Sequence, residues 1–240
     1  MIDIHCHLLP GIDDGPKDDA QALELAHALV ANGLTYVVCT PHIYPGVFDN
    51  TRAEITAQFQ HFQAVLNAAG VPLQLSFGSE VRLGPELLLW SRKGDLPMLV
   101  EERGGKTLLV ELPDSQVPLG TDKLLFQLVK EGIQPVVVHP ERNKQIMAKP
   151  ALVQKLLDVG AKLQVTAGSV IGSFGRPAQE AAEIMLKHDW VNVIASDSHN
   201  TRGRAPKMRE ASEWIEKRFG ADTVHRLFVD GPARLCGLAA

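Results

Sequence analysis

A short pattern repeats along this chain: a helical run, one glycine, and then a few β-branched or aliphatic residues. It occurs in ALVANGLTYVVCT, LNAAGVPLQLSF, LVKEGIQPVVVH and LLDVGAKLQVTA. The glycines Gly33, Gly70, Gly132 and Gly160 stand where helices should end, because glycine adopts the left-handed conformation at little cost. The runs that follow are apolar on both faces, which is typical of parallel strands covered by helices. The pattern therefore predicts alternating β and α units.

Seven strands and seven helices follow from this alternation. We expect strands at 2–6, 35–40, 73–78, 107–111, 134–139, 162–166 and 191–196, and helices at 18–31, 51–69, 84–92, 121–131, 149–159, 176–188 and 204–219. Thr51 and Glu54 form a predicted capping box at the start of the second helix. No low-complexity linker interrupts the series, so residues 1–240 are predicted to form a single domain. Such α/β units form either a closed barrel or an open doubly wound sheet.

Composition excludes several classes of protein. A net charge of −4 and a pI of about 6.1 argue against a nucleic-acid partner. No apolar run approaches the roughly 20 residues of a membrane span, and the N-terminus lacks the pattern of a signal peptide. Cys6, Cys39 and Cys236 are scattered and odd in number, which suits a reducing compartment and buried packing roles. We therefore expect a cytoplasmic protein, and the sequence leaves a homo-oligomer open.

Metal-capable side chains follow six of the seven predicted strands. They are His5, His7, Asp13 and Asp14 after the first strand, His42 after the second, Glu80 after the third, Glu111 after the fourth, His139 and Glu141 after the fifth, and Asp197 and His199 after the seventh. In a βα barrel the carboxyl ends of the strands meet at one mouth, where the chemistry takes place. An open sheet would distribute the same groups over two edges. Their positions therefore favour the barrel.

The spacing within the first strand explains how two ligands can share one cation. Strand residues two apart share a face, so His5 and His7 point together while Cys6 points away. Asp197 and His199 repeat this arrangement near the end of the chain. Imidazole and carboxylate groups without thiolate suit manganese, iron or zinc rather than a structural cysteine–zinc site. The combined pattern predicts a metal centre.

Some residues keep two interpretations at this level. The residues alone do not choose between Asp13 and Asp14, and Glu111 also fits an ordinary salt bridge. Glu141 adjoins His139 with its side chain expected on another face, so it is left out of the predicted ligand set.

A cysteine phosphatase is excluded by spacing. Such enzymes carry an arginine six residues after the nucleophile, but Ile12 and Pro45 stand at that distance from Cys6 and Cys39. The chain ends too soon after Cys236 to provide one.

Several motifs together resemble a known superfamily. HxH in the first strand, TPH after the second, a strand-end glutamate, HPER, and SDxH resemble the PHP (polymerase and histidinol phosphatase) superfamily of metal-dependent phosphoesterases. Within it, GIDDGPKD, PVVVHPERN, LQVTAGSVIGSFG and ASDSHNTRGR closely resemble the bacterial CpsB/CapC-type protein tyrosine phosphatases of capsule and exopolysaccharide production. The similarity extends over essentially the whole chain. It implies a distorted seven-stranded (β/α)7 TIM-like barrel.

The resemblance also implies a cofactor and a set of ligands. It implies three divalent ions, with manganese favoured and iron, magnesium or zinc as alternatives. The implied ligands are His5, His7, Glu80 and Asp197 for the first ion; Glu80, Glu111 and His139 for the second; and Asp14, His42 and His199 for the third. Arg142 and Arg204 take the places of the family's phosphate-binding arginines, and His42 and His199 are counted with them as catalytic residues. The implied partner is a phosphotyrosine-bearing protein, a bacterial tyrosine kinase.

These residues predict hydrolysis of a phosphate monoester by metal-activated water. Three other functions are compatible with parts of the pattern: a small-molecule phosphatase such as a histidinol-phosphate hydrolase, an amidohydrolase, and an inactive metal-binding regulatory module. The amidohydrolases usually place a modified bridging lysine at a strand end, where this chain has Glu80 and Glu111.

Overall fold

The computed structural model describes residues 1–100 and 106–238. Its strands are β1 (Ile2–Cys6), β2 (Tyr36–Cys39), β3 (His42–Ile43), β4 (Gln74–Phe77), β5 (Glu80–Arg82), β6 (Leu99–Val100), β7 (Lys106–Glu111), β8 (Ile133–Val138), β9 (Lys162–Thr166) and β10 (Val193–Ala195). Its α-helices are α1 (Asp19–Ala31), α2 (Arg52–Ala68), α3 (Leu87–Lys93), α4 (Thr121–Lys130), α5 (Lys144–Ala148), α6 (Gln154–Asp158), α7 (Ala167–Val170), α8 (Arg176–Lys187), α9 (Met208–Phe219), α10 (Ala221–His225) and α11 (Gly231–Cys236). Shorter turns are η1 (Pro140–Arg142), η2 (Pro150–Val153) and the π-helical η3 (Arg226–Asp230).

The strands form a closed, distorted barrel. One sheet has the order β10-β9-β8-β7-β5-β3 and the other the order β1-β2-β4, and the neighbours within each order pair in parallel. The chain passes directly from β2 to β3 and from β4 to β5, which joins the sheets along one side. A parallel bridge between Cys6 and Ser198 joins them along the other. The predicted seven-stranded barrel is therefore confirmed.

The distortion lies in the second and third barrel strands. Runs expected at 35–40 and 73–78 each end early, and the chain bends before it resumes as β3 and β5. Proline lacks an N–H, so Pro41 cannot donate to a ladder at the first bend. At the second bend, a Cβ on Gly78 would lie 2.7 Å from a methyl carbon of Leu99, so glycine lets that side chain pack directly against the backbone. Each bend carries a metal-capable residue, His42 or Glu80, inward.

The predicted helix ends are confirmed, with differences in length. Gly33, Gly70, Gly132 and Gly160 have φ values of 86°, 65°, 75° and 92° and follow the last turns of helices. The capping box of Thr51 and Glu54 is present at the start of α2. The helix expected at 149–159 begins as the 3₁₀ turn η2.

The helix expected at 204–219 begins at Met208, four residues late, because Pro206 and its neighbours form a loop. The short antiparallel β6 and the C-terminal helices α10 and α11 were not anticipated from the glycine pattern.

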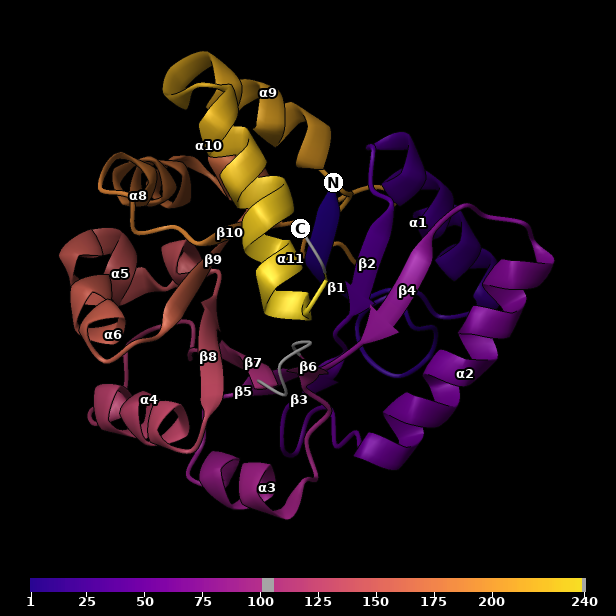
Figure 1. Cartoon of the computed structure of the whole chain (residues 1–240), viewed down its shortest axis with the longest axis horizontal. Coiled ribbons are helices and arrows are strands. Elements are labelled where there is room, and N and C mark those ends of the chain that lie inside the picture. The colour runs from indigo at the N-terminus through magenta and orange to yellow at the C-terminus, as the bar shows by residue number, and fades with distance from the viewer. Residues whose placement is uncertain (101–105, 239–240) are drawn as a thin grey trace.

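Two apolar cores lie on the two sides of the strands. The larger packs the outer strand faces against the helices and includes Leu25, Phe62 and Leu128. The smaller fills the barrel interior and includes Ile4 and Leu235 of α11. Figure 1 shows α11 lying across this end of the barrel, inside a ring of other helices. None of the described helices has the length and apolarity needed to cross a bilayer.

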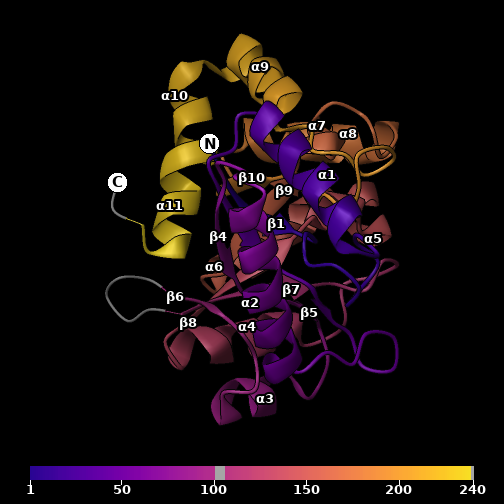
Figure 2. The same ribbon diagram turned by 90° about the vertical axis from the view of Figure 1, so that its right-hand side faces the viewer.

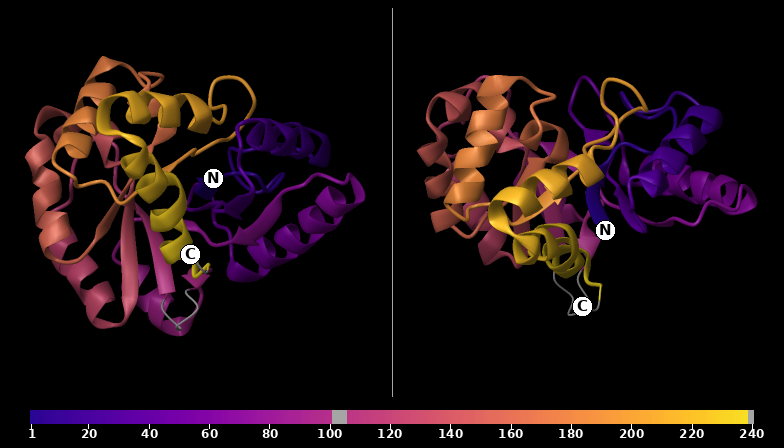
Figure 3. Two further views of the ribbon diagram at one scale, coloured as in Figure 1. Left: turned by 45° about the horizontal axis from the view of Figure 1, so that its top comes forward. Right: turned by 90° about the horizontal axis from the view of Figure 1, so that it is seen from above.

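The loops that follow the strands gather at the opposite end. Figure 2 shows them on the side of the molecule away from α11. In the right-hand view of Figure 3, the loop after β1 and the loop before α9 lie side by side at the edge far from the C-terminus. Ion pairs between Asp14 and His199 and between Asp14 and Arg204 connect these two loops. The candidate site is therefore at the carboxyl ends of the strands.

Candidate metal centre

The site begins with the two histidines of the first strand. His5 donates from Nδ1 to Gln164 Oε1 over 2.9 Å, and His7 donates from Nδ1 to Asp13 Oδ2 over 2.7 Å. These bonds leave both Nε2 atoms, 3.3 Å apart, facing one another, and each can bind a metal ion once it is deprotonated. Fixing the ring of a metal-binding histidine through its other nitrogen is the usual role of such partners. Both rings are therefore oriented toward a common space.

The loop after β1 separates the roles of its two aspartates. The side chain of Asp13 is buried, and its oxygens accept from His7 Nδ1, from the backbone N–H of His42 and from that of Gly15. Asp14 instead has Oδ1 at 3.1 Å from His199 Nε2 and 3.5 Å from His42 Nε2. The geometry therefore assigns Asp13 to orienting His7 and leaves Asp14 as the group able to bind an ion.

The tight turn in this loop requires glycine. A Cβ on Gly15 would lie 2.4 Å from the carbonyl oxygen of His7, which is far inside contact distance. Glycine is the default where backbone must approach this closely. Gly15 therefore allows the aspartates to fold back over the first strand.

Glu80 stands at the centre of the cluster. Its Oε1 accepts from His139 Nε2 at 2.7 Å. Its Oε2 lies 3.2 Å from Nε2 of both His5 and His7, and 3.0 Å from His42 Nδ1. Burial alone would raise the pKa of this carboxyl, but the surrounding histidines hold it well below its usual range. Glu80 is thus an ionised, fully buried group that faces four imidazoles.

The histidines of the cluster form two groups, those whose pKa the protein raises and those whose pKa it lowers. Burial alone would lower the pKa of His7, but Asp13 and Glu80 outweigh it and raise the pKa to about 10. Burial lowers the pKa of His139 to about 4, with Arg142 adding to the effect. Burial and the nearby His7 lower the pKa of His199 to about 4 as well. His139 and His199 are therefore neutral near pH 7, as ligands must be.

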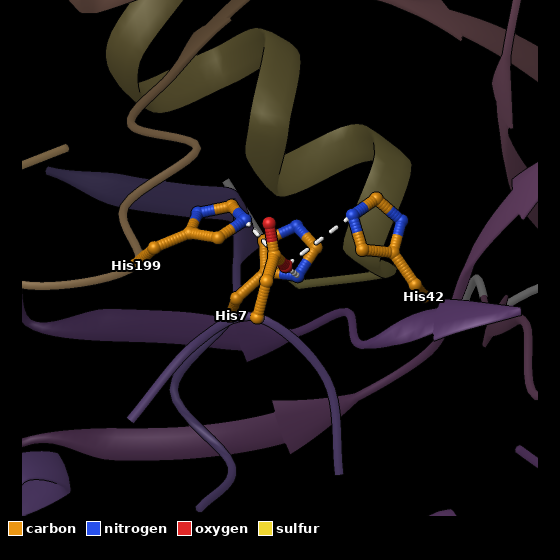
Figure 4. A group of neighbouring side chains, drawn as sticks. His7, His42 and His199 are labelled. Atoms are coloured by element: carbon orange, nitrogen blue, oxygen red, sulfur yellow. Dashed lines mark ion pairs between the residues drawn. The ribbon is translucent and has the colours of Figure 1, made fainter. Parts of the chain in front are cut away.

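Three groups of side chains bring ligand atoms within 4.8 Å of one another. They are His7, Asp14, His42 and His199; His5, His7 and Glu80; and His42, Glu80 and Glu111. Figure 4 shows His42 and His199 on either side of His7, and its dashed lines mark the ion pairs that His42 and His199 each make with the carboxylate of Asp14. The structure therefore brings most of the expected ligands together, with His7, His42 and Glu80 each shared between two groups.

The remaining expected ligands lie at the edge of these groups. His139 reaches Glu80 rather than joining His42 and Glu111. The Oδ1 atom of Asp197 is 3.5 Å from His5 Nε2 and 3.6 Å from His7 Nε2.

The donor set fits divalent ions. Four buried atoms, His42 Nδ1, Glu80 Oε2, Glu111 Oε2 and His199 Nε2, make no hydrogen bond within the described part of the chain. Each of these atoms lies 3.0–3.2 Å from an atom of an ion-pair neighbour, but without the geometry of a hydrogen bond. Buried polar atoms that make no hydrogen bond are rare, so a bound ion is a physical explanation for them. Imidazole and carboxylate ligands suit zinc, manganese or iron. The chemistry of the cluster thus agrees with a centre that binds divalent metal ions.

Two strand-end residues have strained backbones. His139 has a φ of 35° and Asp197 a φ of 51°, although neither is glycine. Non-glycine residues in this region cost about 1–3 kcal/mol and cluster at functional sites. They stand just after β8 and β10, where the chain turns from strand to loop. The fold thus holds two strained residues at the candidate site.

The two arginines both contact Asp197. Arg142 Nη1 lies 2.7 Å from Asp197 Oδ2, and Arg204 Nη2 donates to both carboxylate oxygens over 2.8 Å. Arg204 also reaches Asp14 Oδ2 at 3.4 Å. Burial alone would raise the pKa of Asp197, but Arg142, His5 and Arg204 hold it well below its usual range. The arginines therefore balance the carboxylates at the edge of the cluster.

The position of Glu111 agrees with both of its interpretations, as a metal ligand and as a salt-bridge partner. Its Oε2 lies 3.0 Å from Arg82 Nη1, so it has an ion-pair partner as well as a place in a candidate ligand group. Burial and then the charge of Glu80 raise its pKa to about 7. Glu141 is fully buried and accepts from the backbone N–H of Thr166, so it takes no part in the cluster.

Sequence reasoning missed several supporting residues. Gln164 lies between Leu163 and Val165 in β9 and is fully buried, and no local pattern marks its hydrogen bond with His5. Arg82 and Phe174 had no distinguishing pattern: Arg82 pairs with Glu111, and the Phe174 ring lies 4.8 Å from the guanidinium carbon of Arg142.

A cavity of about 480 Å³ opens beside the cluster. Its lining residues are Asp14, His42, Glu111, Leu112, Asp114, Val138, His139, Arg142, Asn143, Lys144, Phe174 and Arg204. A larger groove of about 850 Å³ runs from Phe48 to Trp90, and the Phe48 ring stacks on His42 at 5.3 Å. The smaller cavity is lined by both arginines and by four of the candidate ligands, Asp14, His42, Glu111 and His139.

The cysteines lie apart from this chemistry. Cys6 and Cys39 are free and fully buried, and burial raises the pKa of both thiols. Burial also raises the pKa of Cys236 to about 12. They fit the predicted packing roles, and a protonated thiol is a poor nucleophile.

The barrel fold and the cluster of histidines and carboxylates at the carboxyl ends of its strands are together typical of metal-dependent hydrolases. The chain belongs to the CpsB/CapC family of capsular polysaccharide synthesis, whose model matches residues 1–236. It is 34% identical over 227 residues to the tyrosine-protein phosphatase YwqE of Bacillus subtilis, covering 95% of this chain and 88% of that protein. It is 29% identical over 244 residues to the tyrosine-protein phosphatase CpsB of Streptococcus pneumoniae, covering 98% of each.

Solved structures agree with this assignment. A chain from crystal structures of YwqE and CpsB, described as unique metal-dependent tyrosine phosphatases, matches with a TM-score of 0.92 at 33% identity, covering 100% of this chain and 96% of that one. A β-aspartyl dipeptidase of Fervidobacterium islandicum matches with a TM-score of 0.57 at 13% identity, covering 98% of this chain and 72% of that one, which shows a shared barrel fold alone.

Proposed function

We propose that this chain is a metal-dependent tyrosine-protein phosphatase of capsular polysaccharide synthesis. The observation that carries the proposal is the buried cluster around Glu80, which opens beside two arginines into a cavity of about 480 Å³. Family membership over residues 1–236 supports the same activity. The buried, protonated cysteines direct the chemistry to metal-activated water rather than a thiolate.

The proposed ligands follow the three predicted sets. We assign His5, His7, Glu80 and Asp197 to one divalent ion, Glu80, Glu111 and His139 to a second, and Asp14, His42 and His199 to a third. Manganese is the proposed ion. When bound, such ions lower the pKa of water for attack on phosphorus and offset the charge of the phosphoryl oxygens.

The protein's own groups position the substrate. Arg142 and Arg204 present planar guanidinium groups, which match phosphate oxygens in pairs. Their ion pairs with Asp197 hold them at the edge of the cluster, where they offset charge that develops on the phosphoryl group. The neutral rings of His42 and His199 complete the site beside Asp14. The leaving tyrosyl oxygen, with a solution pKa of about 10, departs more readily than an alkyl alcohol.

The biological setting is also part of the proposal. The substrate is a phosphotyrosine-bearing protein, a bacterial tyrosine kinase that acts in the same capsule system. Residues 1–240 form one domain, which the continuous family match over residues 1–236 supports. The protein acts in the cytoplasm, where its free cysteines stay reduced. Nucleic acid is not a partner, in keeping with its net charge of −4.

A chelation experiment tests this function. Hydrolysis of a phosphotyrosine peptide is measured with purified protein, with chelator, and after manganese is added back, and histidinol phosphate is the comparison substrate. We expect turnover of the peptide that chelator abolishes and manganese restores. Turnover that survives chelation with no metal left on the protein would disprove metal dependence. Preference for histidinol phosphate would instead indicate a small-molecule phosphatase.

A further inference from the structure

Phe174 lies at a distinctive place in the cavity. It stands in the loop between α7 and α8, is half-buried, and lines the cavity beside Arg142. Among the described residues that line this cavity, it is the one phenylalanine, tyrosine or tryptophan. A benzene ring binds neither a metal ion nor a phosphate group. The metal and phosphate chemistry of the site therefore does not explain the presence of Phe174.

The position of the Phe174 ring is fixed from two sides. On one side, its centroid lies 4.8 Å from the guanidinium carbon of Arg142, a cation–π contact. On the other, a Cβ placed on Gly168 would lie 2.9 Å from Phe174 Cε2. Gly168 lies within α7 and has no positive φ, so backbone conformation does not require glycine there. The missing side chain therefore makes room for the ring.

The cavity lining combines charged and aromatic groups. Arg142, Arg204 and His139 supply charge and nitrogen donors next to the metal-capable cluster. Phe174 supplies an aromatic surface directly beside Arg142, and so beside the proposed phosphate position. A phosphotyrosine side chain combines groups that match both, with a dianion attached directly to a flat ring. Aromatic rings gain from offset or edge-to-face contact beyond the area they bury.

We propose that Phe174 forms the wall of a subsite for the phenol ring of the substrate tyrosine, and that Gly168 keeps this wall in place. The subsite selects aryl over alkyl phosphate esters. The inference rests on the proposed phosphatase function, because it places the phosphate beside Arg142. Phe174 is thus a residue that determines specificity, and Gly168 is a positioning residue that acts through it.

A purely supporting role for Phe174 gives a different expectation. If the ring only held Arg142 in place, its loss would weaken every phosphate-like ligand equally. If the ring contacts the substrate, its loss weakens only ligands that carry an aromatic group. Phenylphosphonate and methylphosphonate separate the two, since both are phosphate-like dianions, neither is hydrolysed, and only one has a ring.

Calorimetric titration of the manganese-loaded protein with each phosphonate provides the test. We expect wild type to prefer phenylphosphonate, and Phe174→Leu to reduce this preference about 5-fold, the size of one aromatic contact. Methylphosphonate affinity should change less than 2-fold, and Phe174→Tyr should keep the wild-type preference. Gly168→Ala, which keeps the ring but displaces it, should reduce the preference by a smaller factor.

A matched control has a cation–π contact outside the cavity. Phe126 is 49% exposed and lies 5.9 Å from Lys130 Nζ, so Phe126→Leu should leave both affinities unchanged. Equal losses for both phosphonates in Phe174→Leu, no loss for either, or a loss in Phe174→Tyr as large as in Phe174→Leu would each overturn the subsite.

Because these titrations need no turnover, they are independent of the phosphatase assay. Hydrolysis of phosphotyrosine without a phenyl preference would refute the subsite alone. A phenyl preference in a protein inactive on phosphotyrosine would refute the proposed function alone.

Discussion

The two ends of the barrel are built from the same strands and have opposite chemistry. Toward α11, the interior is filled by apolar residues such as Ile4, Val136 and Leu235. At the other end, β8 and β10 lead directly to His139 and Asp197, which are buried and polar. Each strand therefore changes character within a few residues. The comparison teaches that one end supplies stability, while the other holds charged groups that a folded protein tolerates only because they are paired.

The largest expected effect is at the centre of the polar end. Glu80→Gln keeps the shape of the side chain but removes the charge that faces four imidazoles, so metal binding should fail. Because bound ions contribute several kcal/mol to catalysis, we expect turnover of a phosphotyrosine peptide to fall about 1000-fold or more. Elemental analysis and circular dichroism should show lost metal in a folded barrel.

The exposed Glu86 provides the control for this substitution. Glu86→Gln should retain both metal and turnover, since this side chain lies outside the candidate ligand groups. Full activity of the Glu80→Gln variant would show that the polar end of the barrel takes no part in catalysis.

A smaller loss of turnover is expected from a substitution at the edge of the polar end. Arg204→Ala removes the donors that contact Asp197 and face the cavity. We expect turnover to fall about 100-fold, as when one preorganised donor to developing charge is lost. Metal content should stay at the wild-type value. If metal is lost while affinity for phosphate survives, Arg204 supports the ligands instead of binding substrate.

The apolar end should respond in stability rather than activity. Leu235→Ala leaves a gap where α11 closes the inner core, and should lower the free energy of unfolding by about 2–3 kcal/mol. Urea denaturation measures this loss, and kcat for the peptide should stay within about 2-fold. Leu119→Ala is the control, because Leu119 is fully exposed. A large loss of kcat in Leu235→Ala would show that the two ends are coupled.

The smallest expected effect is the pH dependence of metal affinity at the polar end. With a pKa raised to about 10, His7 is protonated near pH 7 in metal-free protein, and its stabilising contribution is present below about pH 6.5 and lost as pH rises through 10. An ion that binds His7 must displace this proton, so metal affinity should fall about tenfold for each pH unit of acidification.

Calorimetry in buffers of different ionisation enthalpy should detect the release of about one proton from His7 at pH 8. Asp13→Asn removes a main cause of the raised pKa and should reduce the release. Identical heats in every buffer would contradict the expectation.

Much of the polar end could be predicted because strand ends are local features. A glycine after a helix and an apolar run before a histidine each reflect a few neighbouring residues, and the barrel then brings the ends together. The loop at 204–207 was also accessible, since Pro206 disfavours a helix there. The expected helix was wrong at its start because that signal was overlooked.

The rest depended on contacts between distant residues. The hydrogen bond from His5 to Gln164 joins positions 159 residues apart, and no local pattern marks it. The choice between Asp13 and Asp14 depended on which carboxylate the turn at Gly15 directs to His7 Nδ1. The bends before β3 and β5 arise from Pro41 and from the packing of Leu99 against Gly78. Such features become visible only once the chain is folded.

The burial of Cys6 and Cys39 has a consequence for how such an enzyme withstands oxidative stress. Peroxide and alkylating reagents attack thiolates, and these two side chains are both inaccessible and protonated at neutral pH. A phosphatase that works through imidazole- and carboxylate-held ions therefore keeps its catalytic groups out of reach of the reagents that silence thiol-based phosphatases.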